Sequence, residues 1–409
     1  MKLLRRMMDQ MGKSFEKGKP LSKVEPLYEA LDTFMFTPGK VNKGTTHVRD
    51  GMDLKRLMMT VVWALVPAIL MAMYNTGFQA NLAISNGAEA LDNWRTALVL
   101  GVFGGFDAGN ILSCFFHGFL YYFPVLVVTF GVGGFWEVLF ASVKKHEINE
   151  GFLVTGMLVP MIVPPALPLW QLALAISFGV VLGKEVFGGV GMNIFNPALV
   201  TRAFLFFAYP AAISGDSAWI AARNLGPDTY SGATWLTTAT NGGLQAIGEA
   251  GYSWMDAFLG FIPGSMGETS ALACLIGAAI LIVTRVASWR TMAGVVGGAL
   301  LMSLVLNGIG SDTNLGFSIP FYWHFVLGGF AFGAVFMATD PVSSAYTKQG
   351  QLIYGFFIGL LAVLIRVINP AYPEGMMLAI LFMNMFAPLI DYVYIRGNIK
   401  RRKIRNAAG

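Results

Sequence analysis

Charged residues are scarce in this sequence of 409 residues, at 12% of the chain against the roughly 25% that soluble domains carry. Hydrophobic residues make up 55%, and they fall in many long apolar runs. This balance excludes an ordinary soluble domain and predicts an integral membrane protein. The net charge of +5 is modest and the basic residues gather at the two ends of the chain, which is a topology signal and gives no reason to expect a nucleic-acid partner.

Cysteine is rarer still, with only Cys114 and Cys274, which lie far apart in apolar stretches and form no C-x-x-C pair. That excludes a disulfide framework and a cysteine-ligated metal centre within this chain, although a thiol shared with a partner subunit stays open. The four histidines are isolated from one another, so neither an H-E-x-x-H pair nor a nucleophilic triad is visible. No glycine-rich dinucleotide fingerprint occurs in a soluble βαβ context, so we do not expect this chain itself to bind NADH.

Ten apolar runs read as membrane helices, although several fall short of the roughly 20 residues that a full span needs. Prolines stop some of them early, as Pro164 and Pro165 do after the third run. We therefore predict an all-α integral membrane protein of about ten transmembrane helices, some of them short or broken. The predicted spans are residues 57–74, 111–140, 152–163, 170–183, 198–208, 271–286, 292–306, 324–338, 352–367 and 376–393.

Two stretches far apart in the chain resemble each other weakly. One is G-F-L-V-T-G-M-L-V-P-M-I-V-P-P-A-L-P from Gly151 and the other is G-F-F-I-G-L-L-A-V-L-I-R-V-I-N-P-A-Y-P from Gly355, and both read as a short helix stopped by proline. Broken helices in two related halves often flank a central site, and chance similarity between apolar helices is the alternative. The predicted parts are a basic N-terminal segment (1–55), a first membrane half (56–208), a polar loop (209–255), a second membrane half (256–395) and a basic tail (396–409).

The distribution of lysine and arginine predicts the orientation in the membrane. Both ends of the chain are basic, which fits an even number of spans with both termini in the cytoplasm. The polar loop 209–255, with D-T-Y-S-G-A-T-W at 228–235, then lies on the outer, periplasmic side. This orientation assigns to inner loops Lys144, Lys145, Lys184, Arg202, Arg285, Arg290 and Lys348, and to outer loops only Arg95, Arg223 and Arg366.

Polar residues at membrane depth are the first candidates for chemistry. The glycine-rich stretch G-K-E-V-F-G-G-V-G-M-N-I-F-N-P-A-L (183–199) predicts irregular backbone, which is tolerated at that depth only where it is buried or lines a cavity. Asn193 and Asn196 can each donate and accept, which suits the edge of a flat heteroaromatic ring, while a well-capped turn explains them equally. The carboxylates Glu137, Asp340 and Asp391 in or beside apolar helices indicate a cation site, unless they are helix-end groups that reach water or a lysine.

Two further motifs have both a structural and a functional interpretation. Gly133 and Gly134 in G-V-G-G-F-W-E allow a neighbouring helix or a flat ring to approach the backbone, and helix packing is the more common reason. The stretch P-G-S-M-G-E-T-S (263–270) indicates a helix cap with anion-binding capacity, and capping alone would explain it.

Six motifs follow one another along the chain: F-G-G-V-G-M-N-I-F-N-P-A-L, R-A-F-L-F-F-A-Y-P, S-G-A-T, P-G-S-M-G-E-T-S, F-M-A-T-D-P-V-S and N-P-A-Y-P-E-G-M-M-L-A-I-L. Together they resemble, over nearly the whole chain, the family of membrane subunits that contains the B subunit of the bacterial sodium-translocating NADH:quinone oxidoreductase (NQR) and the D subunit of the Rnf complex. No single motif is decisive, but the ordered set is specific. The basic N-terminal segment and H-E-I-N-E-G-F (146–152) favour the quinone-reducing version.

The resemblance implies a covalently bound flavin in the outer loop. In that family the threonine of S-G-A-T carries FMN through a phosphoester bond, which a dedicated flavin transferase makes outside the membrane. The matching residue here is Thr234, and the motif around it consists of Asp228, Ser231, Gly232 and Ala233, with Thr229 where a glycine is common.

The resemblance also implies riboflavin held within the membrane, a ubiquinone site and sodium-linked carboxylates. The polar neighbours of riboflavin would be Lys184, Asn193, Asn196 and Asp340. The quinone site would use Gly133, Gly134, Glu150, Gly151 and Phe152, and the sodium-linked carboxylates would be Glu29, Glu137, Asp340 and Asp391.

These implications predict one subunit of a respiratory sodium pump in the bacterial inner membrane, a Na+-translocating NADH:ubiquinone reductase. The subunit would pass electrons from NADH-derived carriers to ubiquinone through FMN and riboflavin, coupled to Na+ export. Its partners would be an NADH-oxidising flavin and iron–sulfur subunit, a second FMN-carrying subunit, small membrane subunits, the periplasmic flavin transferase and the lipid bilayer. The alternatives are an Rnf-type subunit and a secondary transporter without a redox cofactor, which would leave the polar outer loop unexplained.

Overall fold

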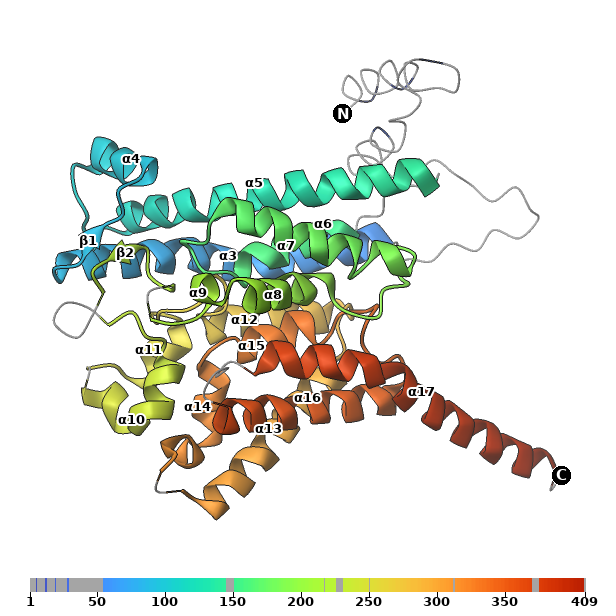
Figure 1. The fold of residues 1–409 in the computed structure, drawn as a ribbon. Helices are drawn as coiled ribbons and strands as arrows, with labels where there is room; N and C mark the ends of the chain where they lie inside the picture. Colours follow the sequence, from blue (N-terminus) through green and yellow to red (C-terminus); the bar gives the residue numbers. More distant parts are fainter. Residues whose placement is uncertain are drawn as a thin grey trace.

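Helices are the predominant secondary structure of the described residues in the computed structural model, and most of them run side by side in one bundle (Figure 1). Among the described residues the only strands are β1 (Glu89–Ala90) and β2 (Ala222–Arg223), which pair antiparallel. The predicted all-α class is therefore confirmed. The structure describes residues 54–144, 151–216, 218–225, 231–249, 251–311, 313–369 and 375–407, together with Arg5, Gly12, Lys19 and Tyr28.

Six helical segments in the described chain are long and apolar enough to cross a membrane. They are α3 (Leu54–Ser85), α5 (Ile111–Lys144), α7 (Leu169–Val181) with the turns that follow it, α13 (Trp289–Ile309), α16 (Lys348–Ile368) and α17 (Met376–Ala407). Shorter apolar helices are α4 (Trp94–Phe103), α6 (Gly151–Met161), α8 (Pro197–Ala208) and α12 (Ala271–Val283). The chain is thus a multi-pass membrane protein, and the count of about ten spans is confirmed only for the six long helices.

The first helix is longer than the predicted span, which ended at Tyr74, because α3 continues to Ser85. Its added turns contain the buried polar residues Asn75 and Asn81. The Asn75 Nδ2 donates to the carbonyl oxygen of Ile262 at 2.8 Å, and the Asn81 Oδ1 lies 2.8 Å from Nδ1 of His117. Polar side chains therefore did not end the helix here, because other elements supply their hydrogen-bond partners.

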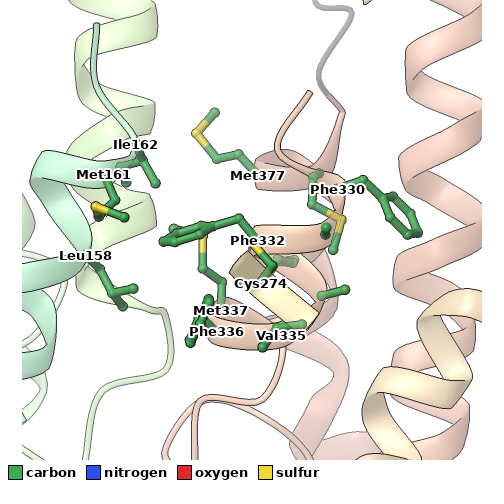
Figure 2. Packing of buried hydrophobic residues seen from close by; sticks show 14 of the residues in the cluster. Leu158, Met161, Ile162, Cys274, Phe330, Phe332, Val335, Phe336, Met337 and Met377 are labelled. Carbon is green, nitrogen blue, oxygen red and sulfur yellow. The ribbon is translucent and has the colours of Figure 1, made fainter. Parts of the chain in front are cut away.

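The predicted span 324–338 is a broken helix. Helix α14 (Phe321–Val326) ends before Gly328, whose φ of 61° lies in the left-handed region, and α15 (Phe330–Phe332) and the π-helix η4 (Gly333–Met337) follow. Figure 2 shows Phe332, Phe336 and Met337 packed beside Leu158 and Met161 of α6. The break thus lies in the buried core, where the two membrane halves meet.

The segment 209–255, predicted as a polar loop, is partly helical. It contains α9 (Pro210–Ile213), β2 and α10 (Trp235–Glu249), and α11 (Trp254–Leu259) begins at its end. Trp235, Leu236 and Ile247 of α10 are buried, so an apolar stripe at helical spacing accounts for the helix.

Two arginines that we assigned to loops lie inside helices instead. Arg202 in α8 and Arg366 in α16 are 4% and 1% exposed. Lys184 is also buried, at 3% exposure. These three cations carry no information about orientation, because none of them reaches a loop in water.

Glycines bring two pairs of long helices into backbone contact. A Cβ at Gly298 of α13 would overlap the carbonyl oxygen of Phe356, and one at Gly359 of α16 would overlap that of Val295. Gly77 of α3 and Gly118 of α5 are equally close to backbone atoms of Cys114 and Met73. Small residues of this kind allow membrane helices to approach closely and gain van der Waals contact.

Candidate functional site

A cavity lies between the two membrane halves, near the first turns of α3. It has about 700 Å³ of empty space, part of it open solvent, and Met58 and Val61 of α3 line it together with α6, α8, α12 and the segment after η4. The cavity wall is mostly apolar with a few polar groups, as is usual for small-molecule sites. The polar lining residues are Thr155, Lys184, Asn193, Asn196, Thr339 and Asp340.

All four residues that the sequence predicts beside riboflavin line this cavity, although Lys184 and Asp340 are far apart in the chain. The short 3-10 helix η2 (Glu185–Phe187) and an irregular turn connect α7 to α8. Gly188, Gly189 and Gly191 have φ values of 123°, 96° and 90°, which residues with a Cβ rarely adopt. The glycines therefore allow the turn that leads the chain from Lys184 to Asn193 and Asn196.

Lys184 is held by carboxylates inside the protein. Its Nζ forms an ion pair with Oε1 of Glu137 on α5, and Oε1 of Glu185 lies 3.9 Å away. The same Nζ stands 5.9 Å from the ring centroid of Phe152 on α6. Glu137 and Glu185 are 5% and 2% exposed, so this is a buried charge cluster in which each ion depends on its partners.

Lys144 connects this cluster to the surface. Its Nζ donates to the backbone oxygen of Glu185 at 2.7 Å and lies 3.3 Å from Oε2 of the same residue. Two lysines and two glutamates thus form one chain of alternating charge, Lys144–Glu185–Lys184–Glu137, which begins at the end of α5, reaches the cavity at Lys184 and ends at Glu137 on α5.

The two asparagines also have structural roles. Oδ1 of Asn196 accepts from the backbone nitrogens of Ala198 and Leu199 and so caps α8. Nδ2 of Asn193 donates to the carbonyl oxygen of Phe195 at 2.9 Å. A ligand in the cavity would therefore meet the amide nitrogen of Asn196 and the amide oxygen of Asn193.

The predicted sodium-linked carboxylates occupy different surroundings. Oδ2 of Asp340 accepts from the Ser343 hydroxyl at 2.6 Å, and the residue faces the cavity. Asp391 on α17 instead accepts from the backbone nitrogens of Tyr346 and Thr347 at 2.6 and 3.0 Å, just before α16 begins. Asp391 therefore anchors the loop that follows Asp340, and Glu137 is paired with Lys184 as above.

The predicted quinone residues that the structure describes have different surroundings. A Cβ at Gly133 would overlap this ring, whereas one at Gly134 would meet nothing within 4 Å. Gly151 lines the cavity and approaches Val190. Three of the predicted site residues, Glu29, Glu150 and Asp228, lie outside the described residues.

Thr234 stands at the N-terminus of α10. Its Oγ1 accepts from the backbone nitrogen of Thr237 at 3.3 Å and lies 2.9 Å from the Thr237 hydroxyl. The residue is half-buried, while Ser231 beside it is exposed. A Cβ at Gly232 would overlap the carbonyl oxygen of Asp216, so this motif position accepts only glycine without a backbone shift.

Beside Thr234 a smaller cavity is bounded by the 263–269 turn and by Gly328 and Gly329 at the helix break. In its wall Oε1 of Glu268 accepts from the Arg202 guanidinium at 2.7 Å. Ser270 caps α12 by accepting from the backbone nitrogen of Ala273, as the capping interpretation of this motif predicts.

Sequence reasoning missed Glu185 as the link between the two lysines and Arg202 as the partner of Glu268. A signal for the second was present, since an arginine within the apolar run V-T-R-A-F-L-F-F is costly unless it is paired inside the protein. The adjacent Lys184 and Glu185 gave no such signal, because a K-E pair is also typical of an exposed turn.

Comparison with known proteins matches residues 41–400 to the NQR2, RnfD, RnfE family. The chain is 56% identical over 405 residues to the B subunit of the Na(+)-translocating NADH-quinone reductase of Chromohalobacter salexigens, covering 99% of this chain and 97% of that protein. It is 56% identical over 407 residues to the subunit of the same name from Azotobacter vinelandii, covering 99% and 100%. For that of Pseudomonas aeruginosa the identity is 55% over 406 residues, covering 98% and 99%. The chain therefore belongs to the NQR2, RnfD, RnfE family, among the B subunits of Na+-translocating NADH-quinone reductases.

Proposed function

We propose that this chain is the membrane subunit of a bacterial Na+-translocating NADH:ubiquinone reductase that binds FMN covalently at Thr234 and riboflavin in the cavity around Lys184. When bound, the two flavins supply reversible electron transfer between NADH-derived carriers and ubiquinone. The observation that carries the proposal is the convergence of Lys184, Asn193, Asn196 and Asp340 on one cavity between the membrane halves. The names and high identity of the relatives support the coupling to Na+.

At the outer end, the chain would hold a phosphate through Thr234. The residue stands where a helix begins, and the backbone N–H groups and partial positive charge of a helix N-terminus favour a bound anion. Ala233 is small and Ser231 is exposed, so they leave room for a transferase to reach the hydroxyl, whereas Gly232 allows the chain to pack against the carbonyl oxygen of Asp216. These features fit a phosphoester at Thr234.

In the cavity, the chain would bind a flat ring by its edges and exclude water from it. The ammonium of Lys184 and the amide nitrogen of Asn196 are donors, and the amide oxygen of Asn193 is an acceptor, so both kinds of ring atom find partners. Apolar residues such as Val154, Leu158 and Phe336 would cover the ring faces. The donor set and the lining therefore fit riboflavin.

The carboxylate of Asp340 offers a physical route to coupling. Negative charge gained in a low-dielectric site attracts a nearby cation, and Asp340 supplies hard oxygen ligands in the same cavity. For the quinone, the surface of α5 at Gly134 and the neighbouring ring of Phe152 remain the proposed contacts, with Gly133, Gly151 and Glu150. Glu137 would act indirectly, through its ion pair with Lys184.

The proposed setting is the bacterial inner membrane with both termini in the cytoplasm. After Lys184, Arg202 and Arg366 are removed from the charge comparison, Lys144, Arg285, Arg290 and Lys348 still outnumber Arg95 and Arg223. The proposed partners are the NADH-oxidising subunit, the second FMN-carrying subunit, small membrane subunits and a periplasmic flavin transferase.

A denaturing gel viewed under ultraviolet light tests the proposal in cells that contain the native transferase. We expect a fluorescent band at the 44.3 kDa chain that disappears in Thr234→Val and persists in the matched control Thr237→Val. Absence of fluorescence from the unmodified chain would favour a transporter without a redox cofactor. Assembled complexes that reduce ferredoxin or are driven by it, and do not reduce ubiquinone, would point to the Rnf-type alternative.

A further inference from the structure

Lys144, the last residue of α5, is connected to the turn between α7 and α8. Its Nζ donates to the carbonyl oxygen of Glu185 at 2.7 Å and lies 3.3 Å from Oε2 of the same residue. The ammonium also stands 5.1 Å from the ring centroid of Phe140, one turn earlier on α5. Neither Lys144 nor Glu185 lines the cavity. Lys144 therefore reaches the cavity only through Glu185 and the neighbouring Lys184.

Glu185 stands between two lysines that compete for its carboxylate. Lys144 contacts Oε2, whereas Oε1 lies 3.9 Å from Nζ of Lys184, which is too far for a hydrogen bond. The bond from Lys144 to the backbone of Glu185 also fixes the turn that carries both Glu185 and Lys184. Lys144 therefore holds the Glu185 carboxylate at a distance from the Lys184 ammonium.

This distance leaves donors on Lys184 for a ligand. An ammonium has three N–H donors, and among the described residues that of Lys184 hydrogen-bonds to Glu137 alone. Because Lys184 lines the cavity, the remaining donors are available to a molecule bound there. If Glu185 moved onto Lys184, a second carboxylate would take one of these donors.

Charge leads to the same expectation. The side chains of the chain Lys144–Glu185–Lys184–Glu137 carry two positive and two negative charges, so the loss of Lys144 leaves one negative charge in excess. Water screens charges weakly inside a protein, and such an excess acts over several ångströms. An excess negative charge beside the cavity would oppose the negative charge that a bound ring gains when it accepts electrons.

We propose that Lys144 is a positioning residue of the riboflavin site and acts from outside the cavity. By holding Glu185, it leaves the Lys184 ammonium to the ligand and balances the second carboxylate. Both effects favour the binding of riboflavin and its reduction by the NADH-derived carriers. The inference rests on the proposed function, because it takes riboflavin as the ligand of this cavity.

Four variants of the whole purified complex test this proposal. Lys144→Met removes the charge at a similar side-chain length, Glu185→Gln removes the carboxylate, and Lys144→Met/Glu185→Gln removes both. Lys348→Met is the matched control, because Lys348 is exposed and takes part in none of the ion pairs of the described residues.

Two measurements are made on each variant. The riboflavin that denaturation releases is separated from FMN and FAD by chromatography and counted per complex. A spectroelectrochemical titration gives the ratio of reduced to oxidised riboflavin at a fixed potential.

The single variants should change this ratio in opposite directions. In Lys144→Met we expect the ratio to fall at least about threefold and less riboflavin to be retained, because one negative charge is in excess. Glu185→Gln should raise the ratio, since it leaves one positive charge in excess. Lys348→Met should leave both measurements unchanged.

The double variant distinguishes charge from anchoring of the turn. Its charges balance, so we expect its ratio to return to within about twofold of the unmodified complex, although the bond from Lys144 to the Glu185 backbone is still missing. If the double variant stays as low as Lys144→Met, Lys144 only anchors the turn and the proposal is wrong. It is equally wrong if Lys144→Met titrates like Lys348→Met while riboflavin is present. An unmodified complex without riboflavin would instead overturn the proposed cofactor site, and this inference with it.

Discussion

At the crossing of α13 and α16 the two backbones touch, whereas around Lys184 the chain leaves space between its halves. Glycine serves both regions. At the crossing, Gly298 and Gly359 remove side chains so that helices fit together, and beside the cavity, Gly188 and Gly189 allow a turn that carries polar groups. The α13–α16 crossing leaves no room for another molecule. The cavity instead contains Lys184, the lysine that is buried in the described part of the chain.

The difference shows how one bundle can be rigid and yet hold a ligand. Close helix contact gives van der Waals stabilisation without polar groups. The cavity instead requires that the charges of Lys184, Glu137 and Glu185 balance one another, because an unpaired buried ion is costly. Substitutions in the two regions should therefore destabilise the protein for different reasons. A second, compensating substitution should also have a different effect in each region.

The largest effect is expected for Lys184→Met, which removes the cation but keeps the length of the side chain. It leaves Glu137 facing another buried carboxylate, and we expect a loss of about 3–5 kcal/mol of stability together with loss of riboflavin. Thermal unfolding and flavin extraction measure the two effects. The double variant Lys184→Met/Glu137→Gln should recover much of the stability and none of the riboflavin. Full riboflavin content in either variant would remove Lys184 from the site.

The next effect is expected for Gly298→Ala at the helix crossing. Its Cβ would overlap the carbonyl oxygen of Phe356, so we expect about 3 kcal/mol of destabilisation and a lower yield of monodisperse complex. Gly297→Ala is the control, because a Cβ there meets nothing within 4 Å. Equal melting temperatures for the two variants would contradict backbone contact at this crossing.

A smaller loss of stability, about 1–2 kcal/mol, is expected for Gly133→Ala, because the added methyl group would press against the Phe152 ring. Gly134→Ala should change stability by less than about 0.5 kcal/mol, since its Cβ points into open space. If quinone binds at this surface of α5, Gly134→Val raises the KM for ubiquinone at unchanged melting temperature. An unchanged KM would exclude Gly134 from the quinone site.

The smallest effect is expected for Asp391→Asn. The new amide oxygen can still accept from one backbone N–H, but the charge-assisted hydrogen bonds that Tyr346 and Thr347 donate are lost. We expect this loss to lower the free energy of unfolding by about 1 kcal/mol. Because these bonds anchor the loop after Asp340, we also expect a higher KM for sodium, with a smaller rise than in Asp340→Asn. A lower melting temperature with an unchanged sodium KM would make Asp391 purely structural.

Much of the fold could be predicted from the sequence, because apolar runs and prolines are local signals. Helix α6 ends at Met161, close to Pro164 and Pro165, as the pattern indicates. The break at Gly328 could not be predicted, since a glycine is tolerated within a helix and the decision depends on a distant contact. Gly329 lies against the Glu268 carboxylate there, and a Cβ would overlap it.

The site was predicted unevenly, and for a similar reason. Lys184, Asn193 and Asn196 share one conspicuous stretch, and the family resemblance added Asp340, which the fold brings to the same cavity. Glu185 was missed because only packing distinguishes a buried K-E pair from an exposed one. Arg202 and Arg366 lie within the predicted spans 198–208 and 352–367, yet we counted them with the loops when we compared charges, although buried partners allow such residues inside a helix.

The charge chain Lys144–Glu185–Lys184–Glu137 meets bulk solvent at one end only. The Lys144 side chain is 33% exposed, while the other three are at most 6% exposed. Counterions can therefore screen the Lys144–Glu185 link and leave the inner pair at full strength. Adding NaCl to titrate the transported ion would at the same time alter the electric field in the cavity, so a sodium dependence reflects binding only when choline chloride keeps the ionic strength constant.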